Sequence, residues 1–260
     1  MKIWYQSLAP IRSLPNYTAA LAAHALEACG ESTTVRFNGV NEARYGGRMP
    51  AEVHRYPYAK LMLQKDSIEF AIDAEREGFD AFVIGSFSEP FLQETRSVLE
   101  VPVVSLAEAS MLAACSLGEQ FALVSLSPSY ARRLRGVVRR HGLEARLSGA
   151  YSLQTHRDEA AVDREFAAPD ELIADFTAMA QRAIDEGADV VIPAEGLLSE
   201  VLYAQGVRSI ASAAILDCVG LTLLNAGMMI QARARLKQTV SRRWSYQRPD
   251  AGLINELRGR

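Results

Sequence analysis

The chain has 260 residues, of which 49% are hydrophobic and 23% charged, so it can bury a full core in one large domain or two smaller ones. Its formal net charge of −3 excludes the basic balance typical of a nucleic-acid-binding protein. No apolar run approaches the ~20 residues of a membrane span, and the segment from Met1 lacks the pattern of a signal peptide, so we expect a cytoplasmic protein.

Taken in chain order, the first half alternates apolar, β-branched segments with helical segments. Strands are predicted at residues 1–6, 33–39, 80–86 and 101–105. Helices are predicted from Ser13 to Cys29, ending at Gly30, and over residues 60–77, ending at Gly78.

The second half repeats this alternation. Strands are predicted at residues 120–126, 145–151, 188–194 and 208–211. Helices are predicted over residues 127–141 and 169–186, and a last long helix over about 213–237.

Strands that alternate with helices indicate parallel sheets covered by helices. We therefore expect an α/β fold of two similar lobes, each with a four-stranded parallel sheet, related by a pseudo-two-fold. The active site is expected in the crevice between them. The expected lobes are residues 1–117 and 118–212. Residues 213–260 are expected to form a C-terminal helix and tail that pack on the first lobe or at a subunit interface of a homo-oligomer.

One stretch of sequence occurs twice without a gap, and it locates the candidate active site. Residues 77–86, EGFDAFVIGS, return as residues 186–195, EGADVVIPAE. In each copy an apolar strand ends in a small residue and then one polar side chain, Ser86 or Glu195. Open α/β sheets bind ligands beyond the carboxyl ends of their strands, so we expect both side chains to face one crevice as catalytic residues. Taken alone, each could instead cap the turn or helix that follows.

Two further strand ends open onto the presumed crevice. They carry polar side chains that could orient a small ligand: Tyr5, Gln6 and Ser7 in the first half, and Ser125 and Ser127 in the second. Both strand ends lead to helix N-termini, which offer unpaired N–H groups to a carboxylate or enolate. The alternative is that these hydroxyls only cap helices.

The segment from Asn41 to Pro50 is long, polar and glycine-containing, as a lid would be. Its Arg44 or Arg48 could pair with an anionic substrate, although a solvated arginine is the commoner case. His54 is the only histidine near this segment. His24, His141 and His156 are expected on helix or loop surfaces.

No cofactor or metal is expected. No glycine-rich phosphate-binding fingerprint follows any predicted strand, and no His, Asp or Glu cluster has metal-ligand spacing. The three cysteines are far apart and lack CxxC spacing.

The paired strand ends, with Pro90 soon after the first copy and VPVV at residues 101–104, resemble the aspartate/glutamate/hydantoin racemase superfamily. The resemblance covers about residues 1–235 and implies an enzyme that acts on a small molecule. In that family's racemases each repeat places a cysteine at this position, and the two thiols flank the substrate Cα to remove and return its proton. In this chain Ser86 and Glu195 occupy the two places.

The acidities of these two side chains leave several reaction classes open. A glutamate has a reference pKa of ~4.3, which a partly apolar site raises toward the range of a general base, whereas a serine hydroxyl is too weak an acid. In the interpretation that we favour, Glu195 activates water or Ser86 to attack an amide, imide or lactam carbonyl, as in a hydrolase. In the alternative, Glu195 moves a proton beside a carbonyl, as in an isomerase, racemase or decarboxylase of amino-acid or hydantoin-like compounds, while Ser86 holds the oxyanion. Small-molecule binding without catalysis is the third interpretation.

Overall fold

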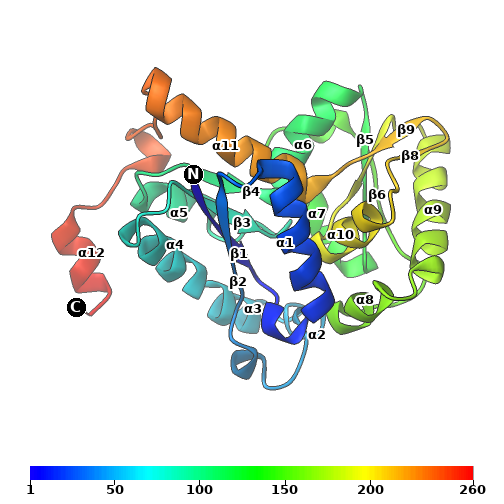
Figure 1. The fold of residues 1–260 in the computed structure, drawn as a ribbon, viewed down its shortest axis with the longest axis horizontal. Coiled ribbons are helices and arrows are strands. Elements are labelled where there is room, and N and C mark those ends of the chain that lie inside the picture. The colour runs from blue at the N-terminus through cyan, green and yellow to red at the C-terminus, as the bar shows by residue number, and fades with distance from the viewer. Residues whose placement is uncertain (260) are drawn as a thin grey trace.

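The computed structural model describes residues 1–259, which form two α/β lobes (Figure 1). The first lobe contains a four-stranded, wholly parallel sheet in the order β2-β1-β3-β4. Its strands are β1 (Lys2–Ser7), β2 (Thr34–Asn38), β3 (Ala81–Gly85) and β4 (Val103–Ser105). The central strands β1 and β3 are buried almost throughout, because helices cover both faces of the sheet.

The second sheet has five strands in the order β6-β5-β7-β9-β8. They are β5 (Phe121–Ser125), β6 (Leu147–Ser152), β7 (Val190–Pro193), β8 (Ser209–Ile210) and β9 (Ala213–Ile215). The first four in this order match the order of the first sheet, so the expectation of two parallel-sheet lobes is confirmed.

The expectation of four strands in the second sheet is wrong at its edge. The predicted strand at 208–211 is the antiparallel edge strand β8, and the fourth parallel strand is β9, which we had assigned to the last helix. The reason lies at Ala211 and Ser212, whose φ angles of 46° and 69° reverse the chain between the two strands.

The helices predicted over 13–29, 127–141 and 169–186 are found nearly as predicted, whereas several further helices were not predicted. The first lobe contains α1 (Pro15–Cys29), α2 (Pro50–Val53), α3 (Pro57–Gln64), α4 (Asp66–Arg76), α5 (Leu92–Val98) and α6 (Leu106–Leu117). The second contains α7 (Pro128–Arg140), α8 (Glu159–Glu165), α9 (Asp170–Asp185) and α10 (Gly196–Ala204), followed by α11 (Cys218–Leu236) and α12 (Ala251–Leu257). The helix predicted over 60–77 is divided at Lys65 into α3 and α4.

The duplicated aspartates explain part of the sequence repeat. Asp80 precedes β3, and its Oδ2 accepts a hydrogen bond from the Lys2 backbone N–H at 2.7 Å. Asp189 precedes β7 and accepts hydrogen bonds from the backbone N–H groups of Glu119 and Gln120, both at 2.9 Å. Each aspartate therefore ties the start of one central strand to the start of its neighbour.

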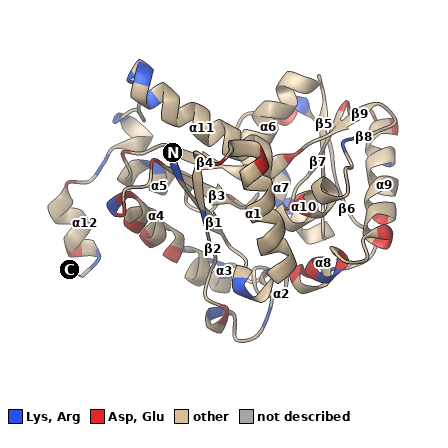
Figure 2. Cartoon of the chain, in the orientation of Figure 1, with Lys and Arg blue, Asp and Glu red and all other residues tan. Residues whose placement is uncertain are grey.

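One apolar core extends through both lobes and includes residues of β1, β3, β5 and β7. Helix α11, orange in Figure 1, packs against α1, α6 and β3 of the first lobe. The tail beyond it also contacts the first lobe, where Arg242 donates to the carbonyl of Arg96 at 2.9 Å. Charged residues of both signs are spread over both lobes (Figure 2). In the part of the chain that the structure describes, none of the helices is both long and apolar enough to cross a membrane.

Candidate active site

A pocket lies between the two lobes, at the carboxyl ends of their central strands. The empty space between its lining residues, counted together with the part open to solvent, is about 760 Å³. Four predicted site residues that end or follow β1, β3, β5 and β7 line this pocket, namely Ser7, Ser86, Ser127 and Glu195. The sheets therefore bring the two halves of the sequence repeat to one pocket, as expected of strand ends in parallel sheets.

Glu195 lies at the start of α10 and caps it. Its Oε2 accepts hydrogen bonds from the backbone N–H groups of Leu197 at 2.6 Å and Leu198 at 3.2 Å. Both bonds go to the same oxygen, so Oε1 is the oxygen available to a ligand. Burial raises the pKa of this carboxyl, while the backbone hydrogen bonds oppose the rise. Glu195 therefore both caps α10 and lines the pocket.

Ser86 directly follows β3 and is partly exposed to the pocket. Its hydroxyl lies 3.0 Å from the Ser88 hydroxyl and accepts a hydrogen bond from the Ser88 backbone N–H at 3.2 Å. The glycine before it, Gly85, is required by close packing, because a Cβ there would clash with the ring of Tyr5. This packing brings the β3 strand end, and with it Ser86, close to β1.

The pocket is also lined by His54, the histidine that the sequence analysis placed near the segment from Asn41 to Pro50. The Tyr45 hydroxyl donates to the carbonyl of Leu8 at 2.6 Å and lies 3.1 Å from His54 Nε2. Because the tyrosine proton is used at Leu8, His54 Nε2 carries the proton and donates to the tyrosine oxygen. Burial and the charges of Lys60 and Arg133 lower the pKa of His54 to about 4, so this imidazole is neutral at neutral pH.

Five of the predicted site residues lie outside the pocket lining. Tyr5 packs in the core against Phe37, and Gln6 is buried with its amide bonded to Trp4, Asn38 and the Ser7 carbonyl. Ser125 is buried and donates to backbone carbonyls. Side chains alternate between the two faces of a strand, so only some positions near each strand end reach the pocket.

The two lid arginines also lie elsewhere. Arg44 pairs with Asp66 at 2.9 Å, and Arg48 pairs with Glu52 at 3.3 Å. Both line a separate surface groove, because the polar segment folds into a 3-10 turn (Glu42–Tyr45) and α2.

Sequence reasoning missed a second carboxylate in the pocket, Glu159, in the first turn of α8. Its side chain is buried, and its Oε2 accepts a hydrogen bond from the Ala51 backbone N–H of the first lobe at 3.1 Å. Burial, and secondarily the charge of Glu195, raise the pKa of Glu159 to about 7. Nothing in the local sequence marks this glutamate, since helices commonly carry an acidic residue in their first turn.

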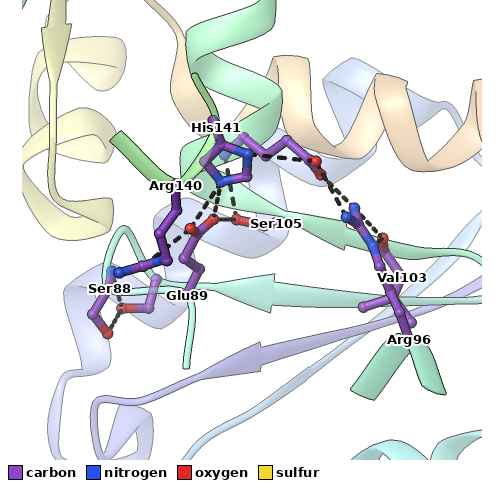
Figure 3. Close-up of polar contacts among 9 residues, drawn as sticks. Ser88, Glu89, Arg96, Val103, Ser105, Arg140 and His141 are labelled. Atoms are coloured by element: carbon purple, nitrogen blue, oxygen red, sulfur yellow. Dashed lines mark hydrogen bonds and ion pairs between the residues drawn. The ribbon is translucent and has the colours of Figure 1, made fainter. Parts of the chain in front are cut away.

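The loop after Ser86 is tied to the second lobe by a buried ion network (Figure 3). Glu89 has a φ of 36° and accepts hydrogen bonds from Ser105 at 2.8 Å and from His141 Nε2 at 2.8 Å. Arg140 donates to the same carboxylate at 3.2 Å. The hydrogen bond to Glu89 raises the pKa of His141, although burial and the charge of Arg140 oppose the rise. The expectation that His141 lies on a surface without a role is therefore wrong.

His24 is likewise buried rather than on a surface. It stacks on Tyr203 with ring centroids 3.5 Å apart, and its two ring nitrogens face Glu200 at 2.8 Å and Asp217 at 3.0 Å. This cluster joins α1 of the first lobe to α10 and the start of α11. Neither histidine could be found from local pattern, because their partners lie far away in the sequence.

Among residues 1–259, no three His, Cys, Asp or Glu side chains are grouped closely enough to hold a metal ion. The pocket offers two carboxyl groups with raised pKa, serine hydroxyls and a neutral imidazole. Such a set suits proton transfer and hydrogen bonding to a developing oxyanion.

Residues 15–226 match the Asp/Glu/Hydantoin racemase family. The chain belongs to this family. Among curated proteins, a hydantoin racemase from Pseudomonas sp. (strain NS671) is 34% identical over 98 residues, which cover 38% of this chain and 39% of that protein. A hydantoin racemase from Paenarthrobacter aurescens is 35% identical over 82 residues, 31% of this chain and 35% of that protein. The matched segments thus span less than half the length of these relatives.

The fold is similar to that of solved racemases over nearly the whole chain. An allantoin racemase from Klebsiella pneumoniae superposes with a TM-score of 0.74 at 16% identity, covering 96% of this chain and 94% of that one. An allantoin racemase from Pseudomonas fluorescens gives a TM-score of 0.72 at 19% identity, covering 96% and 97%. The chain therefore has the fold of these solved racemases, in agreement with the family to which it belongs. The hydrolase interpretation that we favoured from sequence is not supported, and the isomerase alternative fits these relatives better.

Proposed function

We propose that this enzyme is a cofactor-independent isomerase that moves a proton on a carbon beside a carbonyl group in a small hydantoin-like or amino-acid-like compound. The observation that carries the proposal is the position of Glu195, whose carboxylate has a raised pKa and lines the interlobe pocket opposite the first-lobe residue Ser86. The hydantoin racemase relatives support the substrate class.

In the proposed step, Glu195 Oε1 takes the proton from the substrate carbon. The electron pair of the broken C–H bond moves onto the carbonyl oxygen, and the Ser86 hydroxyl donates a hydrogen bond to that oxygen. The planar intermediate then turns its other face to Glu195, and return of the proton to that face restores the carbonyl group with inverted configuration at the carbon. A serine hydroxyl is too weakly acidic to act as the second proton donor at neutral pH, so Ser86 acts as an oxyanion donor.

The test is solvent exchange at the substrate carbon. Wild-type enzyme in deuterium oxide should replace the C5 hydrogen of 5-methylhydantoin or allantoin with deuterium, as followed by NMR. Glu195→Gln should reduce this rate by ~10²–10⁴-fold, which is typical of losing a general base. The variant should stay folded, because the glutamine amide oxygen still accepts the hydrogen bonds that cap α10.

Glu119→Gln is the matched control, because Glu119 is exposed and lies outside the pocket. It should exchange at the wild-type rate. A Glu195→Gln variant that keeps more than half of the wild-type rate would remove Glu195 from the mechanism. The cytoplasmic location and the homo-oligomeric state stay predictions from sequence.

A further inference from the structure

Two basic side chains line the interlobe pocket from opposite lobes without an acidic partner. Lys60 lies on α3 of the first lobe and Arg133 on α7 of the second, and both line the pocket that holds Ser86 and Glu195. Among the ion pairs and side-chain hydrogen bonds of residues 1–259, neither Lys60 nor Arg133 takes part. The one directional contact of the Arg133 guanidinium is with the ring of Tyr130, 5.3 Å from its centroid.

The other arginines considered for ligand binding are paired with carboxylates. The other pocket arginine, Arg157, is buried and pairs with Glu165 and Asp175, both at 2.7 Å. Its charge is therefore already neutralised within the second lobe. The lid arginines that the sequence suggested for an anionic substrate are also paired, and they lie outside the pocket. Lys60 and Arg133 are thus the cations of this pocket that remain free to meet a ligand.

The positive charges of these side chains lower the pKa values of neighbouring basic groups. Burial and the charges of Arg133 and Arg140 lower the pKa of Lys60. Burial and the charges of Lys60 and Arg133 lower the pKa of His54. Like charges that repel one another without a counter-ion are relieved when an anion binds between them.

We propose that Lys60 and Arg133 form a carboxylate-binding subsite, so that the preferred ligand of this pocket carries a carboxylate in addition to the carbonyl at its reacting carbon. A carboxylate accepts hydrogen bonds from both an ammonium and a guanidinium group. Because the two cations come from different lobes, a bound carboxylate links the lobes across the pocket. The reaction of a bound carboxylate ligand rests on the proposed function. Its binding to the subsite is measured without any reaction.

The experiment compares two ligands that differ in charge and hardly in shape, hydantoin-5-acetate and its amide. Binding is measured by calorimetry on wild-type protein and on Lys60→Met and Arg133→Gln. Wild-type protein should bind the acid at least ~10-fold more tightly than the amide, and each variant should lose most of this preference. Succinate, which lacks a hydantoin ring, serves as a second carboxylate probe.

Matched controls are Lys65→Met and Arg132→Gln. Lys65 is exposed at the end of α3, and Arg132 precedes Arg133 on α7 but lines a different groove. Both controls should keep the wild-type preference for the acid. The proposal is overturned if no carboxylate probe binds more tightly than the amide, or if the variants and the controls behave alike. Exchange of the neutral hydantoins without any preference for the acid would overturn the subsite while leaving the isomerase function in place.

Discussion

Glu195 shows how one side chain serves both the fold and the site. One carboxylate oxygen caps α10 through two backbone N–H groups, which fixes the direction of the side chain. The other oxygen takes no part in the cap, and Glu195 lines the pocket. Capping stabilises the charged form, whereas burial opposes it more strongly, so the pKa of the carboxyl stays above its ordinary value.

The raised pKa of Glu195 has a direct consequence for pH dependence. A general base acts only when deprotonated, so the acidic limb of kcat/KM for solvent exchange should lie above the reference glutamate pKa of ~4.3. Glu159→Gln should still show an acidic limb, because burial keeps the pKa of Glu195 raised when its neighbour Glu159 is replaced by a neutral side chain. A limb at or below ~4.3, or one that disappears in Glu159→Gln, would contradict the assignment to Glu195.

Ser86 is expected to act on the transition state rather than on substrate binding. Ser86→Ala should lower kcat for exchange by ~10²–10³-fold with a smaller change in KM, as for removal of an oxyanion-hole donor. Ser88→Ala is the comparison, because it leaves the Ser86 hydroxyl and its bond from the Ser88 backbone N–H in place. It should cost less than ~10-fold. Equal losses in the two variants would indicate that the serine pair only shapes the loop.

At the scale of elements, two helical glycines are expected to respond oppositely to substitution by alanine. At Gly220, in the first turn of α11, a Cβ would clash with the Asp217 carboxylate and lie 2.7 Å from His24 Nε2. Asp217 also caps α11, with its Oδ1 accepting from the Gly220 N–H at 2.9 Å, so this side chain has little room to move. Gly220→Ala should therefore lower the free energy of unfolding by ~1–3 kcal/mol.

Gly136 lies in α7, and a Cβ there would meet no atom within 4 Å. Gly136→Ala should raise the free energy of unfolding by ~0.5–1 kcal/mol, because alanine loses less backbone entropy than glycine in a helix. Denaturant unfolding of the two variants, followed by circular dichroism, checks both signs. A stabilising Gly220→Ala would show that the His24 cluster is looser than the structure indicates.

At the scale of the molecule, the lobes are joined by ionic contacts as well as by the common apolar core. The His24 cluster links α1 to α10 and to the start of α11, and the Glu89 network links the loop after β3 to the end of α7. In both cases a histidine meets carboxylates of distant elements. These ionic contacts between the lobes are therefore strongest when the histidines are protonated.

This dependence predicts a pH effect on stability. Burial disfavours the charged form of His24, but its hydrogen bonds to Asp217 and Glu200 outweigh burial and raise its pKa to about 9. A pKa raised in the folded state contributes stability in full below the unfolded value of ~6.5 and loses it as the pH rises toward about 9. The difference in unfolding free energy between wild type and His24→Gln should shrink over this range. A difference that stays constant with pH would mean that His24 is neutral in the folded protein.

The local pattern of the sequence was sufficient for the layout of the fold and for the centre of the candidate site. Strand–helix alternation and the repeat around Asp80 and Asp189 predicted two parallel sheets, because apolar periodicity is set by neighbouring residues. The same repeat predicted that Ser86 and Glu195 end equivalent strands, and parallel topology then brings both to one pocket. The antiparallel direction of β8 and the strand β9 were not predicted, because two residues with positive φ and no glycine reverse the chain between them.

The tertiary structure alone decided which charged side chains meet. Arg44 and Arg48 pair with neighbouring acids away from the pocket, whereas Lys60, Arg133 and Glu159 converge on it from three separate helices. The buried His24 and the partly buried His141 become ion-pair partners only because the lobes pack together. Such proximity depends on how whole elements are oriented, and hydrophobic periodicity along the chain carries no information about the partners of an individual polar side chain.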